Sequence, residues 1–186
     1  MLSPLIGIIA SSGVAASTSA YESIATTTVG SGGASSVTFS SIPSTYTHLQ
    51  VRGISRSAGA GQNMLLQLNG DTGSNYAYHN LYGDGSSAQA ASATTQSSSY
   101  AGYVPASSST ANAFGGFVLD ILDYANTSKY KTIRSLNGTD LNGSGLMVFT
   151  SGLWMNTVAT TSLTFYTNAG NLAQYSSFAL YGIKGA

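Results

Sequence analysis

The stretch HLQVRGISR, residues 48–56, decides the fold class because its side chains alternate strictly between apolar and polar. Leu49 and Val51 fall on one face of an extended chain, and Gln50 and Arg52 fall on the other. A period of two residues is typical of a β-strand with one buried face. We therefore look for further strands of the same kind on both sides of it.

Similar runs recur along the chain, and most of them end at Gly, Asn, Asp or Pro residues that favour turns. They span residues 21–29, 37–42, 65–68, 116–124, 130–136, 145–155, 162–167 and 177–184. About eight to eleven short strands predict an all-β fold, an antiparallel β-sandwich, with a jelly roll as the favoured topology. The predicted core comprises Leu49, Val51, Leu66, Leu68, Phe117, Leu119, Ile121, Ile133, Val148, Phe165, Phe178 and Leu180.

Residues 84–112 have a different composition, because Ser, Ala and Thr dominate two tracts of low complexity. We expect long surface loops here, with one short strand near residues 100–104 between them. No amphipathic helical period of useful length is present anywhere in the chain.

The charge balance excludes several classes of function. Only 6% of the 186 residues are charged, against about 25% in an average domain, and six acidic residues cancel six basic ones. Binding to nucleic acid or to an anionic membrane surface needs clustered Lys and Arg, so neither is expected. Without cysteine, disulfides and thiolate sites are impossible. A net charge of zero favours association, which is typical of a subunit of an assembly.

The first ten residues, MLSPLIGIIA, are apolar. A signal peptide would need Lys or Arg before this run, and none is present. The run is also shorter than the roughly 20 residues that span a bilayer. We divide the chain into an extended N-terminal arm, residues 1–20, and a sandwich domain, residues 21–186. The arm is expected to dock on a neighbouring subunit; the alternative is an edge strand of its own domain. Its apolar side chains are Leu2, Leu5, Ile6, Ile8 and Ile9.

Candidate catalytic and metal-binding residues are few. A metal site with the two histidines, His48 and His79, would need a third ligand, for which Asp71, Asp84 and Glu22 are the candidates. For each histidine we favour instead a half-buried side chain bonded to the backbone. Asp120 and Asp123 differ by an odd number of positions, so a strand places them on opposite faces, unlike a glycosidase pair. Asp71 belongs to a turn with a single carboxylate, too few for calcium. We predict no catalytic residue, no cofactor and no metal.

Tyrosine is the one enriched recognition residue, with 12 copies. A tyrosine ring offers a large, rigid contact area with one polar end. Protein interface, core and glycan contact all remain open for the tyrosines beside the predicted loops. The sole tryptophan, Trp154, lies in an apolar run and is expected in the core. The tyrosines in question are Tyr76, Tyr78, Tyr82, Tyr100 and Tyr103.

Several segments together resemble a known family. They are YESIATTTV at residues 21–29, VTFSSIP at 37–43, YTHLQVR at 46–52, LNGDTGSNY at 68–76, ILDY at 121–124 with Lys131-Thr132, and FALYGI at 178–183. Over residues 20–186 this pattern resembles small virion structural proteins of tailed bacteriophages. The resemblance implies a structural protein of the particle, without catalytic residues to transfer.

The resemblance leaves two roles within a virion. We expect a capsid decoration or cement protein at the particle surface, which stabilises the shell through its arm and sandwich faces. Its partners would be further copies of itself, as a homotrimer, and the major capsid protein or other virion proteins. The first alternative is a tail or head fibre module that binds host-surface glycan. The second is a free carbohydrate-binding module, and an enzyme is not expected.

Overall fold

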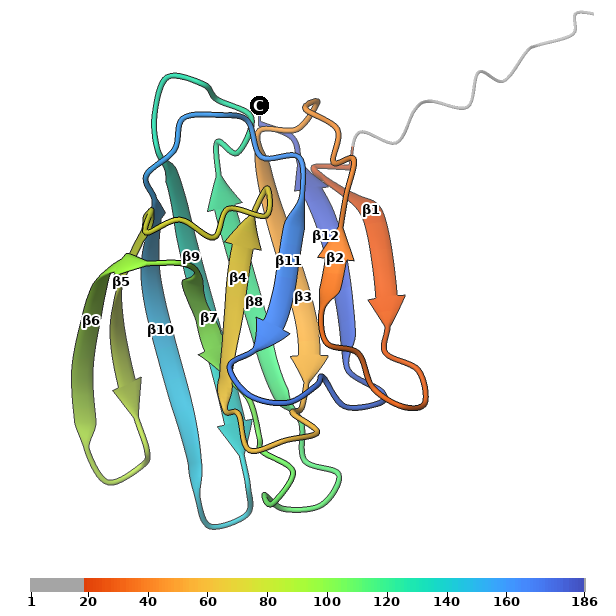
Figure 1. The fold of residues 1–186 in the computed structure, drawn as a ribbon, viewed down its shortest axis with the longest axis vertical. Helices are drawn as coiled ribbons and strands as arrows, with labels where there is room; N and C mark the ends of the chain where they lie inside the picture. Colours follow the sequence, from red (N-terminus) through yellow and green to blue (C-terminus); the bar gives the residue numbers. More distant parts are fainter. Residues whose placement is uncertain (1–18, 186) are drawn as a thin grey trace, which may run out of the picture.

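The computed structural model describes residues 19–185, which fold into two antiparallel β-sheets packed face to face (Figure 1). This part of the chain holds twelve strands and no helix. In chain order the strands are β1 (Tyr21–Thr28), β2 (Val37–Phe39), β3 (His48–Ser55), β4 (Asn63–Leu68), β5 (Tyr76–Gly83), β6 (Ala88–Gln96), β7 (Ser99–Tyr103), β8 (Gly115–Leu122), β9 (Lys131–Asp140), β10 (Gly145–Trp154), β11 (Leu163–Thr167) and β12 (Ser177–Ile183).

The two sheets differ in size. The large sheet has the order β1-β12-β3-β8-β9-β10-β5-β6, and the small sheet has the order β2-β11-β4-β7. The predicted antiparallel sandwich is confirmed. The jelly roll is not, because that topology has about eight strands in two sheets, whereas the large sheet alone contains eight in the described residues.

The core lies between the two sheets. All twelve side chains that the alternation assigned to it are buried, and so is Trp154. Phe117 of β8, Phe165 of β11 and Phe178 of β12 join the sheets, with ring centroids 5.5 to 5.9 Å apart. The prediction succeeded because each of these strands turns every second side chain toward the facing sheet.

The tract of low complexity contains a strand that the sequence did not predict. Ala88–Gln96 forms β6, which pairs with β5 and leaves most of its side chains exposed. The preceding turn is held by Asp84, whose carboxylate accepts the backbone N–H groups of Ser86 and Ser87 at 2.9 and 2.8 Å. The short strand predicted near residues 100–104 is confirmed as β7.

The second tract, residues 106–113, is a loop as predicted, and Arg56 clamps it. The Arg56 guanidinium donates hydrogen bonds to four main-chain carbonyls at 2.7 to 3.2 Å. The carbonyls belong to Ser107, Ser109, Thr110 and Ala113. One cation therefore holds a loop that has no regular structure of its own.

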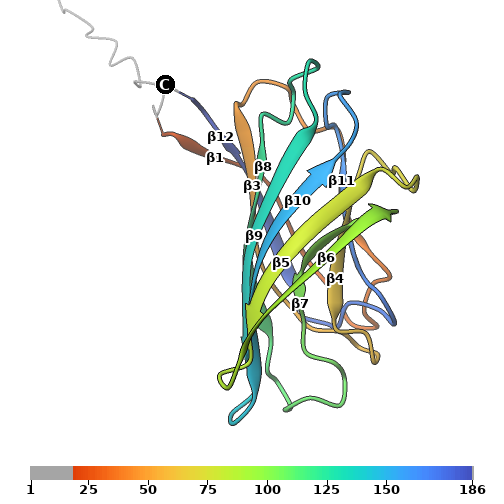
Figure 2. The ribbon, with the colours of Figure 1, turned by 90° about the vertical axis from the view of Figure 1, so that its left-hand side faces the viewer.

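The large sheet extends beyond the small one on the side of β5 and β6. The edge strand of the small sheet, β7, lies nearest β10 and β9. Figures 1 and 2 show β5 and β6 projecting past it, at the side opposite β1. The inner face of this overhang is thus left without a facing strand, and the whole outer face of the large sheet is uncovered among the described residues.

Candidate functional site

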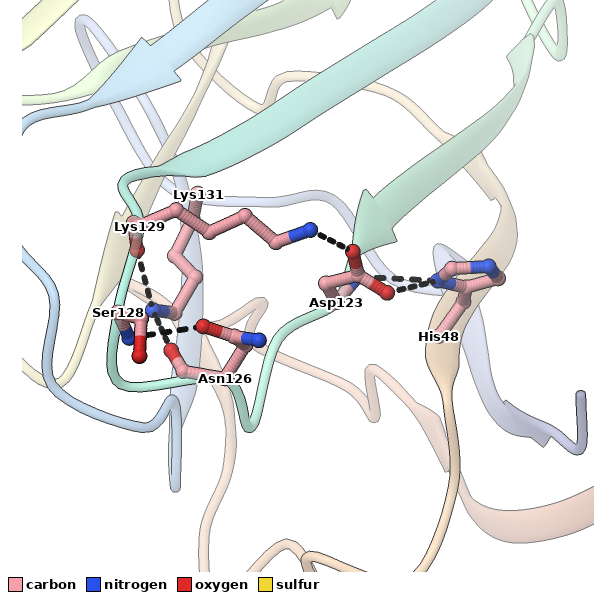
Figure 3. Close-up of polar contacts among 6 residues, drawn as sticks. All are labelled: His48, Asp123, Asn126, Ser128, Lys129 and Lys131. Carbon is pink, nitrogen blue, oxygen red and sulfur yellow. Dashed lines mark hydrogen bonds and ion pairs between the residues drawn. The ribbon is translucent and has the colours of Figure 1, made fainter.

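Two of the predicted polar candidates, His48 and Asp123, lie in a cluster at the end of β8 that stabilises a turn (Figure 3). His48 accepts the backbone N–H of Asp123 on Nδ1 at 2.9 Å, as the backbone-bonded interpretation predicted. The Asp123 carboxylate pairs with Lys129, whose hydrogen bond holds the pKa of Asp123 below its usual value. The second histidine, His79, is exposed on the outer face of β5, so the half-buried interpretation is wrong for it. Over residues 19–185, no group of three His, Cys, Asp or Glu side chains could hold a metal ion.

Lys131 also stabilises this turn, through hydrogen bonds from its ammonium group. Its side chain is fully buried, and its ammonium group donates to the carbonyls of Asn126, Lys129 and Thr157. Burial lowers the pKa of Lys131. Because all three bonds go to main-chain oxygens of loops, we assign this lysine a structural role.

The outer face of the large sheet begins with a polar row across β3, β8 and β9. Gln50 donates to Asp120 at 2.8 Å and accepts from Arg52 Nε at 2.7 Å. Arg134 completes the row at 3.4 Å from the Asp120 carboxylate. The charge of Asp120 is therefore paired with that of Arg134 on the outer face. Asp123 lies in the turn beyond the strand, so the two aspartates do not form a catalytic pair.

Beside this polar row, the outer face carries large apolar side chains. Val118, Leu136, Phe149 and Leu81 are direct cross-strand neighbours on β8, β9, β10 and β5. They are 40 to 58% exposed. We call these four residues, together with Ile54 and Met147 of the next row, the outer apolar patch. Such an arrangement was not predicted from the sequence.

Glycines shape the patch. Gly116 and Gly138 lie in register between Ile54 and Met147, and a Cβ at Gly116 would meet no atom within 4 Å. The missing side chains leave a shallow groove of about 670 Å³ across the sheet. The groove and the exposed side chains around it form one continuous surface.

The predicted tyrosines divide into two groups. Tyr78 and Tyr82 of β5 and Tyr100 and Tyr103 of β7 line one hollow of about 330 Å³. Because its lining comes from the inner face of β5 and from β7, it lies on the inner face of the overhang, beside the edge of the small sheet. Tyr78 packs on Tyr100 with ring centroids 5.7 Å apart. We call this space the tyrosine hollow.

Tyr76 does not belong to the hollow, which corrects its assignment as an interface or glycan aromatic. It is fully buried, and its ring stacks on Trp154 at 6.3 Å. Its hydroxyl oxygen accepts the N–H of Leu68 at 2.9 Å. Of the three interpretations left open, the core is the correct one for this residue.

The predicted assembly residues of the arm, Leu2, Leu5, Ile6, Ile8 and Ile9, lie outside the described residues. Docking of the arm therefore stays a prediction.

No helix of residues 19–185 is long and apolar enough to cross a membrane. Comparison of the chain with protein-family models, with curated proteins and with solved structures returned no match. The outer apolar patch and the tyrosine hollow are two surfaces of the described residues that are open to a partner or a ligand.

Proposed function

We propose that the chain is a non-enzymatic structural protein of a bacteriophage particle, a decoration protein that binds the shell through the outer apolar patch. The patch is the observation that carries this proposal, because a sheet face with six exposed large apolar side chains needs a partner. We infer that the partner is the shell protein, because residues 20–186 resemble small virion structural proteins.

The size of the patch supports a contact that is repeated many times. Six large apolar side chains that are 40 to 62% exposed make a patch on the order of 600 Å², at the upper end for a monomer. This is somewhat below the ~800 Å² per partner of a stable pairwise interface. At roughly 25 cal/mol per Å² its burial favours binding by about 15 kcal/mol before the cost of association.

A homotrimer would strengthen such contacts. Three patches carried by one particle-bound trimer bind with an effective concentration that a single patch lacks. The low charge of the chain fits this mode, because little of the binding energy would come from ion pairs that salt screens. The polar row of Gln50, Asp120 and Arg134 would set the orientation of the contact.

The experiment measures the copy number of the chain relative to the major shell protein, by quantitative mass spectrometry of purified particles. A number comparable to that of the shell subunit is expected. A small number would instead assign the chain to a tail or fibre. Its absence from particles would overturn the proposal.

A binding assay on isolated shells tests the surface itself. The double variant Leu136→Ser/Phe149→Ser removes the centre of the patch without touching the core and should abolish binding. Val158→Ser is the matched control, because Val158 is similarly exposed but lies outside the patch. Equal binding of both variants to the shell would exclude the patch as the contact surface. If the patch instead joins copies of this chain, the double variant would lose the oligomer.

A further inference from the structure

We propose that the tyrosine hollow is a binding site for a neutral saccharide of one or two rings. This inference does not rest on the shell contact, since the hollow lies on the opposite face of the large sheet. It assigns a ligand class to four residues that would otherwise only fill space.

The aromatic walls have the geometry that a sugar ring needs. Tyr78 and Tyr82 point to the same side of β5 and are half-buried, so part of each ring faces the hollow. Tyr100, which is only 8% exposed, braces Tyr78 from behind. The C–H groups on one face of a pyranose pack well against such a rigid, partly exposed aromatic ring, while the hydroxyl ends meet polar atoms.

The polar groups of the hollow are incompletely paired. Asn80 lies between Tyr78 and Tyr82 on the same face of β5, and its Oδ1 is buried without a hydrogen-bond partner in the described part of the chain. A buried acceptor in this state costs about 1–3 kcal/mol. Because this oxygen is closed to solvent, a sugar hydroxyl reaches it when the Asn80 amide, which lines the hollow, turns toward the ligand; the new hydrogen bond then removes the cost.

Two tyrosine hydroxyls are held by the protein and two are not. Tyr82 donates to Gln89 at 3.0 Å, and the Tyr103 hydroxyl accepts a hydrogen bond from Gln62. The hydroxyls of Tyr78 and Tyr100, which also line the hollow, make no hydrogen bond within residues 19–185. These two groups are available for a ligand.

Charge and size restrict the ligand. The side chains that line the hollow come from Asn, Tyr, Ala, Ser, Leu and Val, so none of them is charged at neutral pH. An anionic sugar would find no cation there. A volume of about 330 Å³ is at the low end for small-molecule sites, which fits one or two sugar rings.

Tyr76 provides an internal comparison. It has the same orientation on β5 as Tyr78 and Tyr82, but it lies under the small sheet and is fully buried. Tyr78 and Tyr82 lie where the small sheet has ended, beside its edge strand β7. The hollow therefore exists because the two sheets differ in width, and the overhang of β5 and β6 leaves it open.

The experiment uses the full chain and saturation-transfer NMR, followed by calorimetry. The probes are galactose, glucose, N-acetylglucosamine, lactose and maltose, with galacturonic acid as the charged counterpart of galactose. We expect at least one neutral sugar to bind and galacturonic acid not to bind. Failure of all five neutral sugars at millimolar concentration would overturn the proposal.

Variants locate the binding. Asn80→Ala should weaken it about tenfold or more, which corresponds to about 1.4 kcal/mol. Ala91→Trp should block the hollow, because Ala91 lines it from the exposed strand β6 and supports no core contact. Tyr175→Ala is the control, since this tyrosine is 66% exposed and does not line the hollow. Unchanged binding in Asn80→Ala and Ala91→Trp would refute the site.

The two proposals fail separately. Ala91→Trp should leave shell binding intact, and Leu136→Ser/Phe149→Ser should leave saccharide binding intact. Adsorption of particles to host cells, with and without free sugar as a competitor, distinguishes a cell-surface glycan from a free sugar as the source of the saccharide.

Discussion

Replacing Asp71 with alanine should destabilise the domain by about 3 kcal/mol, although Asp71 lies in a surface turn. Its carboxylate accepts the indole N–H of the buried Trp154 at 2.7 Å, the N–H of Gly73 at 2.8 Å and the amide of Asn75 at 2.9 Å. Loss of the acceptor leaves the indole donor buried and unpaired, which costs about 1–3 kcal/mol. The two bonds within the turn add a smaller amount because they are partly solvated.

Urea unfolding followed by tryptophan fluorescence is the suitable assay, because Trp154 is the only tryptophan. In a thermal scan with the same fluorescence signal, a loss of about 3 kcal/mol should lower the melting temperature by roughly 6–12 °C at this chain length. Asp84→Ala is the matched control: Asp84 also accepts backbone N–H groups in a turn, but no buried side chain depends on it. Equal midpoints for the two variants would show that the Trp154 bond does not matter.

The same carboxylate predicts a pH dependence. Burial acts to raise the pKa of Asp71, but the hydrogen bonds from Trp154, Asn75 and Gly73 outweigh it and hold the pKa below its usual value. The stabilisation is therefore complete above the unfolded pKa near 3.9 and is lost as the pH falls through the lower folded pKa. Asp71→Asn should flatten this acid limb; an unchanged slope would contradict the assignment.

Three further predictions follow from other contacts. Lys131→Met should cost about 3–5 kcal/mol in unfolding free energy, because three partly buried carbonyls lose a charged donor; full stability in urea would contradict this role. Arg56→Ala should speed hydrogen exchange in residues 106–113 while the exchange of β8 stays unchanged, and a uniform increase would argue against a local clamp. Shell binding should vary little between low and high salt, because the outer apolar patch is uncharged; a steep dependence on ionic strength would refute burial as its source.

The sandwich was predictable because its core strands obey a simple alternation. In β8, Phe117, Leu119 and Ile121 are buried as alternation requires. The strand β6 escaped prediction because Ala, Ser and Thr alternate in no apolar pattern, and both of its faces are open. Residues 88–96 form a strand because they pair with β5, and this pairing depends on the tertiary structure rather than on the local sequence.

The candidate surfaces were predictable only in part. The tyrosines beside the low-complexity tract were identified, but the alternation of β5 cannot show where the facing sheet ends, so Tyr76 and Tyr78 look alike in the sequence. The outer apolar patch was missed for a different reason. Leu136 and Phe149 come from strands that carry apolar residues on both faces, and only the register aligns them.

The clamp formed by Arg56 bears on how this protein can change. It recognises the loop of residues 106–113 through main-chain carbonyls, which any sequence of the same length also supplies. Ser109 and Thr110 add side-chain hydrogen bonds of their own, and Asn112 has a positive φ, so these three positions are constrained while the other side chains of the loop are free to diverge. A foreign peptide of equal length that replaces residues 107–113 and keeps these three residues would be held in a defined shape, which makes this loop the natural place to display a peptide on the scaffold.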